Sequence, residues 1–263
     1  MPVATTSVDV QSARFNCRVD GPPEAPLLVL SNSLGTNLAM WEDQMAALVQ
    51  RFRVLRYDAR GHGASSVTPG PYTIGELGRD VLALLDALKA RKVHFCGLSM
   101  GGMVGMWLAV HAAERIDRLV LANTAPQIGT QETWNTRIEN VRKGGLAAIA
   151  DGVLERWFTK AFHERAPASA ARLRAMLTAT PVEGYIASCA AVRDMNQWDT
   201  VGRIASPTLV IAGKHDASTP PAEGRKLAER ISGARYVELD AAHISNVEAA
   251  ERFTAELTGF LAG

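Results

Sequence analysis

The sequence predicts an α/β protein with a mostly parallel central sheet and helices on its faces. Short apolar runs such as Leu27–Ser33, Val93–Cys96 and Arg118–Thr124 are separated by stretches with helical spacing. Continuous apolar runs are typical of parallel strands that are buried on both faces. Their alternation with helices favours right-handed crossovers and a doubly wound sheet. A stretch without strand patterns, from about residue 126 to 199, interrupts this alternation.

Length and composition favour a single domain. The chain has 263 residues, of which 47% are hydrophobic, so it can bury a large core. We expect residues 1–125 and 200–263 to form the sheet domain, and residues 126–199 to form a helical cap inserted between two late strands. The net charge is +1 and no block of like charges occurs, which argues against a nucleic-acid partner. The expected partners are small molecules.

The elements of the first half follow from local patterns. Val3–Val10 and Arg14–Val19 alternate weakly before a Gly-Pro-Pro turn, which favours two paired opening strands. The run Leu27–Ser33 predicts a buried strand, and leucines and valines at helical spacing predict a helix within Tyr72–Ala90. The other predicted elements are a helix near Glu42–Gln50 and a strand over Arg53–Tyr57.

The second half contains the helical stretch and then returns to strands. Helical patterns over Trp134–Val141 and Leu146–Phe158 lie within that stretch, and the sheet resumes with a strand over Thr208–Ala212. Ser245 and Glu248 have the spacing of a capping box, which predicts where the last helix begins. The remaining predicted elements are a helix over Pro221–Ile231, a strand over Arg235–Leu239 and a final helix to Leu261.

A candidate nucleophile lies between a strand and a helix. Gly97, Ser99 and Gly101 form the pattern Gly-x-Ser-x-Gly in that context, which indicates a nucleophilic serine. A serine in so sharp a turn has strained backbone angles, and a β-carbon two residues away would collide across the turn. The turn would raise the Ser99 hydroxyl above the sheet and aim the first helical amides at its target. An ordinary glycine-rich turn before a buried helix is the alternative.

Ser99, Asp216 and His243 occur in the order nucleophile, acid, base, each at or just after a predicted strand. The carboxyl ends of parallel strands share one edge of a sheet, so we expect the three side chains to meet there. His243 would accept the Ser99 proton, and Asp216 would hold the imidazole in the required tautomer. Asn123, which follows the preceding strand, cannot ionise and is excluded as the acid.

Three other residues compete for roles in this chemistry. His62 has no acid partner in a useful order, so we expect it to brace its loop. His215 is adjacent to Asp216, residues so placed rarely face each other, and no acid is expected to lie suitably for it. Cys96 falls within an apolar strand, where a small buried thiol is usual. His243 is therefore the predicted base.

Acyl-transfer chemistry also requires two backbone N–H donors for an oxyanion. One belongs to the residue after the nucleophile and the other to the loop after an earlier strand. Met100 and Leu34 occupy these positions, although the Leu34 loop is also explained as a plain strand-to-helix turn. The sequence contains no metal-ligand cluster, phosphate-binding loop or dinucleotide fingerprint. We expect no metal and no cofactor.

Cysteine usage and the N-terminal residues indicate the compartment. Cys17, Cys96 and Cys189 are widely separated, so we expect reduced thiols. The first ten residues, MPVATTSVDV, show neither a basic leader nor an apolar signal core. The longest apolar run, Met100–Val110, is too short to cross a bilayer. We expect a cytoplasmic protein with no membrane partner.

Several segments together resemble the α/β-hydrolase superfamily and, more closely, the 3-oxoadipate enol-lactonases of aromatic catabolism. These segments are SNSLGTNLAMW, LRYDARGHGASS, GPYTI, FCGLSMGG, WFT, EGY, IAGKHDASTP and DAAHISNVE. The resemblance implies the α/β-hydrolase fold and hydrolysis of the enol-lactone of 3-oxoadipate to 3-oxoadipate in the β-ketoadipate pathway. It also implies roles for Ser99 as nucleophile, Asp216 as acid, His243 as base, and the Leu34 and Met100 amides as oxyanion hole.

A lactone of this kind carries a free carboxylate, which requires a cation or hydrogen-bond donors near the pocket. Trp134 and Arg137 share one face of a predicted helix in the cap, so we expect Arg137 to bind this carboxylate with Trp134 beside it. Arginine side chains also cover apolar surface, which is the alternative. Two other functions stay open: a cofactor-free esterase, perhydrolase or carbon–carbon hydrolase of the same fold, and a hydrolase-like ligand receptor with little turnover.

Overall fold

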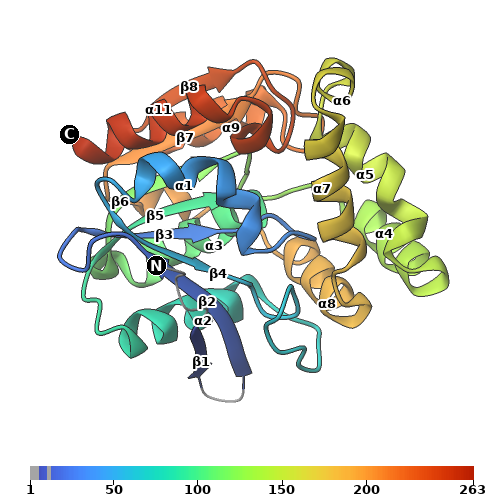
Figure 1. The fold of residues 1–263 in the computed structure, drawn as a ribbon, viewed down its shortest axis with the longest axis horizontal. Coiled ribbons are helices and arrows are strands. Elements are labelled where there is room, and N and C mark those ends of the chain that lie inside the picture. The colour runs from blue at the N-terminus through green and yellow to red at the C-terminus, as the bar shows by residue number, and fades with distance from the viewer. Residues whose placement is uncertain (1–5, 11–12) are drawn as a thin grey trace.

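A computed structural model of the chain describes residues 6–10 and 13–263. Among these residues, eight strands form one sheet in the order β1-β2-β4-β3-β5-β6-β7-β8 (Figure 1). The strands are β1 (Thr6–Val10), β2 (Ala13–Asp20), β3 (Leu27–Ser31), β4 (Arg53–Tyr57), β5 (Val93–Leu98), β6 (Ile116–Ala122), β7 (Thr208–Gly213) and β8 (Arg235–Leu239).

The sheet is mostly parallel, as the sequence predicts. Strands β3 to β8 pair in parallel, whereas β2 is antiparallel to both β1 and β4. The opening hairpin is therefore the predicted one, with residues 3–5 of its expected first strand outside the described residues. Every residue of β3, β5 and β7 is buried, which explains why these strands appear in the sequence as continuous apolar runs.

Helices cover both faces of the sheet. Helices α1 (Glu42–Leu48) and α11 (Ala250–Ala262) pack together on one face, and α2 (Ile74–Ala87) and α3 (Met100–His111) pack together on the other (Figure 1). Helix α9 (Pro221–Arg230) packs on β7 and β8. This arrangement confirms the predicted α/β architecture.

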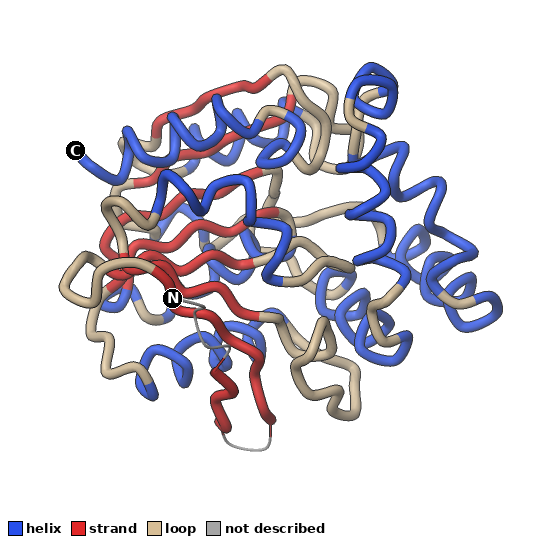
Figure 2. The backbone as a smooth tube through the Cα atoms, in the orientation of Figure 1, coloured by secondary structure: helices blue, strands red, loops and turns tan. Residues whose placement is uncertain are grey.

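Five helices form a cap at one end of the sheet, on the right in Figure 1. They all lie between β6 and β7 in the chain, and no residue from 126 to 199, a range that is fully described, belongs to a strand (Figure 2). The cap helices are α4 (Gln131–Gly144), α5 (Ala150–Trp157), α6 (Lys160–Arg165), α7 (Pro167–Thr178) and α8 (Val182–Arg193).

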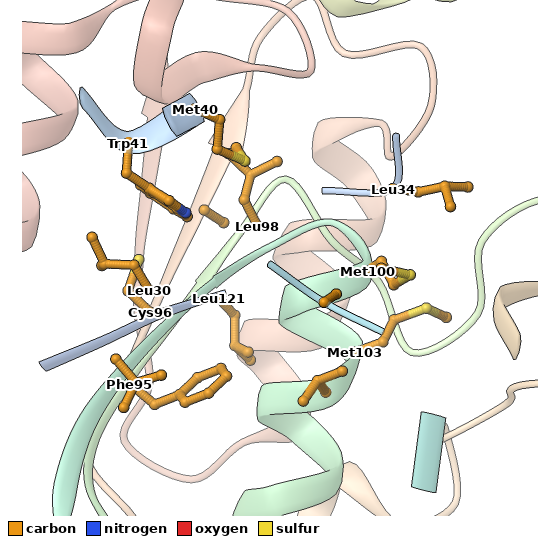
Figure 3. Packing of buried hydrophobic residues seen from close by; sticks show 14 of the residues in the cluster. Leu30, Leu34, Met40, Trp41, Phe95, Cys96, Leu98, Met100, Met103 and Leu121 are labelled. Atoms are coloured by element: carbon orange, nitrogen blue, oxygen red, sulfur yellow. The ribbon is translucent and has the colours of Figure 1, made fainter. Parts of the chain in front are cut away.

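The hydrophobic core extends directly under the turn at Ser99. Leu98 before that turn and Met103 after it are both fully buried. Figure 3 shows them among side chains from neighbouring strands, for example those of Leu30 and Leu121. Full burial of a side chain of this size stabilises the fold by about 1.5–3 kcal/mol. The turn is therefore held on a rigid, close-packed base.

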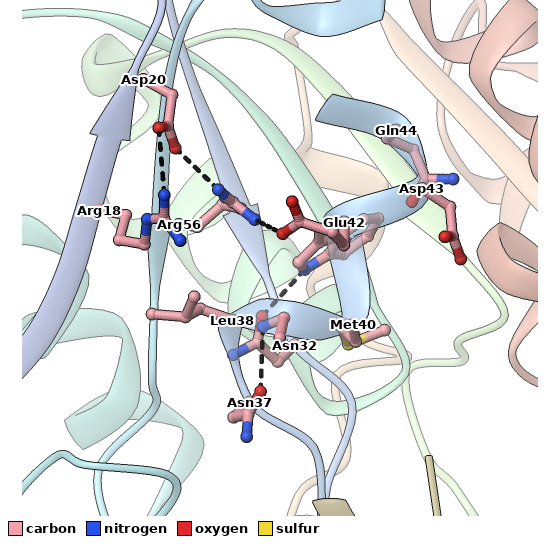
Figure 4. Close-up of polar contacts among 12 residues, drawn as sticks. Arg18, Asp20, Asn32, Asn37, Leu38, Met40, Glu42, Asp43, Gln44 and Arg56 are labelled. Atoms are coloured by element: carbon pink, nitrogen blue, oxygen red, sulfur yellow. Dashed lines mark hydrogen bonds and ion pairs between the residues drawn. The ribbon is translucent and has the colours of Figure 1, made fainter. Parts of the chain in front are cut away.

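A buried arginine fixes helix α1 against the sheet. Arg56 on β4 is 2% exposed, and it forms ion pairs with Asp20 on β2 and with Glu42 at the start of α1, each at 2.8 Å (Figure 4). An arginine suits this position because its planar guanidinium presents several donors in a fixed geometry. The loop that contains Leu34 begins at the end of β3 and ends at α1. Both of its ends are held, because β3 pairs with β4 and Arg56 of β4 binds Glu42 of α1.

The predicted capping box at the last helix is wrong. Ser245 and Glu248 lie in a separate short helix, α10 (Ser245–Glu248), and α11 begins only at Ala250. The Ser245 hydroxyl donates to Oδ1 of Asn123, and the Glu248 carboxylate accepts the N–H of Ala242. Long-range partners occupy both side chains, so neither is available to cap a helix.

No helix among the described residues is long and apolar enough to cross a membrane. The expected cytoplasmic location stays a prediction.

Candidate active site

Ser99 lies in a strained turn between β5 and α3. Its φ is +57°, in the left-handed region that non-glycine residues rarely adopt. A β-carbon on Gly97 would lie 2.1 Å from the carbonyl oxygen of Gly101, and one on Gly101 would lie 2.2 Å from that of Ser31. Only glycine fits at either position. These clashes explain why the sequence pattern has a glycine two residues before the serine and another two residues after it.

Hydrogen bonds to neighbouring strands and loops hold this turn. The Ser99 N–H donates to the carbonyl oxygen of Ala122 at 2.9 Å, and the Ser99 carbonyl accepts the hydroxyl of Thr124 at 2.7 Å. The N–H of Gly101 donates to the carbonyl oxygen of Asn32 at 3.0 Å. The turn therefore contacts the ends of both flanking strands, β3 and β6, and its strain is balanced by well-formed bonds.

Asp216 and His243 form a buried pair. Nδ1 of His243 lies 2.8 Å from Oδ2 of Asp216, and the two side chains are 5% and 0% exposed. Burial by itself raises the pKa of Asp216, but the charge of His243 and the hydrogen bonds from His243 and Thr219 outweigh it, so the pKa lies below its ordinary value. The ionised carboxylate orients the ring through Nδ1 and leaves Nε2 available for chemistry.

Further donors complete the coordination of the Asp216 carboxylate. Oδ1 accepts the N–H groups of Ser218 and Thr219, and Oδ2 accepts the Thr219 hydroxyl. Nδ2 of Asn123 donates to Oδ2 at 3.0 Å and also to the carbonyl oxygen of Ala242. Asn123, which cannot itself ionise, thus positions the acid and the histidine loop together, a role that the sequence does not reveal.

Ser99 and His243 open into the same cavity, of about 290 Å³, between the sheet edge and the cap. Its wall also contains Leu34 from the loop after β3, and Trp134 and Arg137 from α4. Asp216 lies behind His243, and Met100 follows Ser99 in the chain. Among the described residues, no hydrogen bond joins the Ser99 hydroxyl to His243. Such contacts are often long before substrate binds.

The amides of Leu34 and Met100 are poised as hydrogen-bond donors. In the part of the chain that the structure describes, neither N–H has a protein acceptor, although both residues are buried. The next N–H in each case is occupied, that of Gly35 by Nε2 of His62 and that of Gly101 by Asn32. Figure 3 shows Leu34 and Met100 on neighbouring segments. Unpaired buried amides are costly, so the pair is suited to bind an oxygen of a ligand.

The expected loop-bracing role of His62 is confirmed. Its Nε2 accepts the N–H of Gly35 at 3.0 Å, and its Nδ1 lies 3.2 Å from the carbonyl oxygen of Arg60. Since Nε2 must be unprotonated to accept, Nδ1 carries the hydrogen and the ring is neutral. Burial lowers the pKa of His62, which favours this neutral form.

His215 differs in one respect from the prediction. An acid does lie beside it, since Oδ1 of Asp240 is 2.8 Å from Nε2 of His215. Asp240 directly follows β8, so the two residues meet only when β8 pairs with β7. Both side chains are largely exposed, and His215 does not line the cavity of Ser99. Cys96 is fully buried, and burial raises its thiol pKa, so it is not a reactive thiolate.

Two arginines face the cavity without an acidic partner. The Arg137 guanidinium lies over the Trp134 ring, 4.8 Å from its centroid, and Trp134 donates through Nε1 to the carbonyl oxygen of Ile128. Arg156, from α5, lines the same cavity, and burial followed by the charge of Arg137 lowers its pKa. No acidic residue lines this cavity, and neither arginine has an ion pair among the described residues. Sequence reasoning missed Arg156, which directly precedes the WFT segment.

The described residues contain no cluster of three or more metal-binding side chains. The chemistry that this arrangement allows is nucleophilic attack by Ser99 with His243 as base and two amides for the resulting negative charge.

Comparison with known proteins agrees with the fold. Residues 26–250 match the family model for the alpha/beta hydrolase fold. The chain is 43% identical to 3-oxoadipate enol-lactonase 2 of Acinetobacter baylyi over 94% of its own length and 92% of that protein's, and 39% identical to 3-oxoadipate enol-lactonase 1 of the same organism over 95% and 94%. The chain therefore belongs to the α/β-hydrolase family.

Within this family the similarity to enol-lactonases extends over nearly the whole chain. The crystal structure of the enol-lactonase from Burkholderia xenovorans LB400 superimposes with a TM-score of 0.97 and 48% identity, covering 98% of this chain and all of that one. Sequence, fold and relatives agree that the protein is a hydrolase.

The neutral form of His62 gives a testable pH dependence. The unfolded chain protonates this histidine below about pH 6.5, whereas burial keeps the folded form neutral to lower pH. The unfolded state thus binds more protons in that window, and His62 lowers the free energy of unfolding as the pH falls through it. We expect urea denaturation of the wild type and His62→Gln to show a stability difference that shifts against the wild type between about pH 7 and pH 5. A difference independent of pH would contradict a neutral His62.

Proposed function

We propose that this protein hydrolyses the enol-lactone of 3-oxoadipate to 3-oxoadipate through an acyl-enzyme on Ser99. The observation that carries the proposal is the Asp216–His243 pair, at 2.8 Å, behind a cavity that also contains Ser99 and two unpaired arginines. The names and the nearly full-length similarity of the enol-lactonase relatives support the substrate. The implied context is the β-ketoadipate pathway of aromatic catabolism.

The first half of the reaction forms the acyl-enzyme. Ser99 Oγ attacks the lactone carbonyl carbon while Nε2 of His243 accepts its proton, and Asp216 stabilises the imidazolium. The carbonyl oxygen becomes an oxyanion between the amides of Leu34 and Met100, and each such donor contributes about 3 kcal/mol. The ring C–O bond then breaks and the proton passes from His243 to the leaving oxygen.

The leaving group makes this step favourable. An enolate delocalises its charge onto carbon, so it leaves more readily than an alkoxide. The enol stays attached to the acyl chain and tautomerises to the ketone. Water then loses a proton to His243 and attacks the acyl carbon, which releases the carboxylate and regenerates Ser99. One water is consumed for each lactone opened.

The charge of the cavity fits an anionic lactone. The free carboxylate of the substrate would be bound by Arg137 and Arg156, two guanidiniums that the protein itself leaves without acids. Trp134 holds the Arg137 group through its ring face and forms part of the apolar wall beside it. The cap would thus recognise the charged end of the substrate, and the sheet edge would carry out the chemistry.

Ser99→Ala tests the nucleophile. We expect kcat/KM for the enol-lactone to fall by about 10⁴-fold or more, because removal of a serine nucleophile abolishes the acyl-enzyme route. The reaction is measured by the decrease in ultraviolet absorbance as the lactone is consumed. Cys96→Ala serves as the control, because it removes a buried thiol three residues before Ser99 that does not line the cavity, and it should keep near wild-type kcat. Slow single turnover by the wild type would instead indicate a ligand receptor.

Arg137→Met and Arg156→Met test carboxylate binding. Loss of a charge-assisted hydrogen bond corresponds to about 1.5–3 kcal/mol, so each change should raise KM for the anionic lactone by about 10-fold or more. For a small neutral ester such as p-nitrophenyl acetate, kcat/KM should stay within about 3-fold of the wild-type value, since this ester has no carboxylate for the arginines to bind. Arg142→Met, an exposed arginine of the same helix α4 that does not line this cavity, is the matched control. Equal losses on both substrates would rule out the carboxylate role.

A further inference from the structure

Glu248 is a buried carboxylate for which the proposed reaction has no direct use. It is 5% exposed and lies five residues after His243. In the described part of the chain, the donors to its two oxygens are all uncharged groups: the N–H of Ala242 at 2.8 Å, the N–H of Thr159 at 3.2 Å and the Thr159 hydroxyl. Burial of a carboxylate without a cation is costly unless such donors are placed for it. This donor set therefore needs an explanation.

The donors belong to two separate parts of the molecule. Ala242 directly precedes His243 in the loop after β8, whereas Thr159 lies in the cap as the N-terminal cap of α6. One carboxylate thus joins the histidine loop to the cap. The sequence segments involved, DAAHISNVE and WFT, are far apart in the chain.

Two further hydrogen bonds complete the same joint. The N–H of Ile244 donates to the carbonyl oxygen of Trp157 at 3.1 Å, and an Nη of Arg165 donates to the main-chain carbonyl of Glu248 at 2.8 Å. The N–H groups on both sides of His243 are therefore fixed, one by Glu248 and the other by the cap segment that ends α5.

The cap side of the joint also faces the substrate cavity. Trp157 and the preceding Arg156 both line the cavity that contains Ser99. Any displacement of Thr159 relative to Glu248 would move this wall, because only one residue separates Thr159 from Trp157. The joint consequently sets two distances at once, from the base to the nucleophile and from the cap wall to the reacting centre.

We propose that Glu248 is a positioning residue that aligns the His243 loop with the Arg156–Trp157 wall of the cap. This inference rests on the proposed lactone hydrolysis for the substrate side and on the His243 geometry for the base side. Replacement of the carboxylate by an amide turns one acceptor into a donor that faces Thr159 or Ala242, so the joint loosens. A reacting group displaced by about 1 Å can lose up to about 100-fold in rate.

The test compares kcat and KM on the anionic enol-lactone and on p-nitrophenyl acetate. Glu248→Gln should lower kcat about 10-fold on both substrates, because the base is displaced, and raise KM about 5-fold for the lactone alone. Thr159→Val removes the hydroxyl that donates to Glu248 and that also accepts the N–H of Phe162 as the N-terminal cap of α6, and it keeps the Thr159 N–H donor. It should raise the lactone KM and leave the ester kcat within about 2-fold. Thr159→Ser, which restores the hydroxyl, should return both values to those of the wild type.

Thr180→Val is the matched control, since it removes another buried hydroxyl of the cap, which donates to the carbonyl oxygen of Met176 away from the joint. The proposal is wrong if Glu248→Gln and Thr159→Val lower the Tm but leave kcat and KM unchanged, or if KM changes equally for the two substrates. If Glu248→Gln does not fold, the Thr159 pair decides. A wild type that cleaves the ester but not the lactone would refute the proposed substrate, while the ester kcat of Glu248→Gln would still decide the alignment of the base.

Discussion

The structure depends on one backbone constraint, the left-handed conformation of Ser99 between β5 and α3. Such a conformation costs about 1–3 kcal/mol for a residue with a side chain, so it persists only where its surroundings enforce it. Here Gly97 and Gly101 permit main-chain approaches that a β-carbon would prevent, with overlaps at 2.1 and 2.2 Å. The close approach of Gly101 to Ser31 brings the N-terminus of α3 against the end of β3. The two segments with unpaired amides are thereby adjacent, and Ser99, the proposed nucleophile, directly precedes the helix whose first amide is proposed to bind the oxyanion.

The other parts of the site are fixed by buried polar residues that take no part in the proposed chemistry themselves. His62 holds the loop after β3, Asn123 holds Asp216, and Glu248 holds the loop of His243. Each of these side chains bonds main-chain or carboxylate groups from a different segment of the chain. Functional loops carry little packing of their own, so their geometry requires bonds of this kind to a rigid framework. In the proposed reaction, cationic side chains of the cap bind the substrate carboxylate, and the sheet edge supplies the reactive groups.

The sequence reveals those features that depend on short-range patterns. Apolar runs mark the buried strands, and glycines at fixed spacing identify Ser99, because the turn itself demands them. Residues whose role depends on a distant partner are not visible in this way. Ser245 and Glu248, three residues apart, have the local spacing of a helix cap, yet both side chains form hydrogen bonds with groups outside that helix. Asn123 cannot ionise and instead donates to Asp216, and Arg156 is recognisable only after α5 is seen to face the cavity. Local spacing cannot distinguish such alternatives, since the competing contacts come from elements far along the chain.

In the proposed mechanism, the Asp216–His243 pair activates Ser99 for covalent catalysis. The most direct test is labelling with a fluorophosphonate, which reacts with activated serines, followed by mass spectrometry of the intact chain and of its peptides. We predict one adduct per chain, located on Ser99, and a labelling rate at least about 100-fold lower in His243→Gln, in which the general base is absent. An adduct on another residue, or equal labelling rates for the two proteins, would contradict this mechanism.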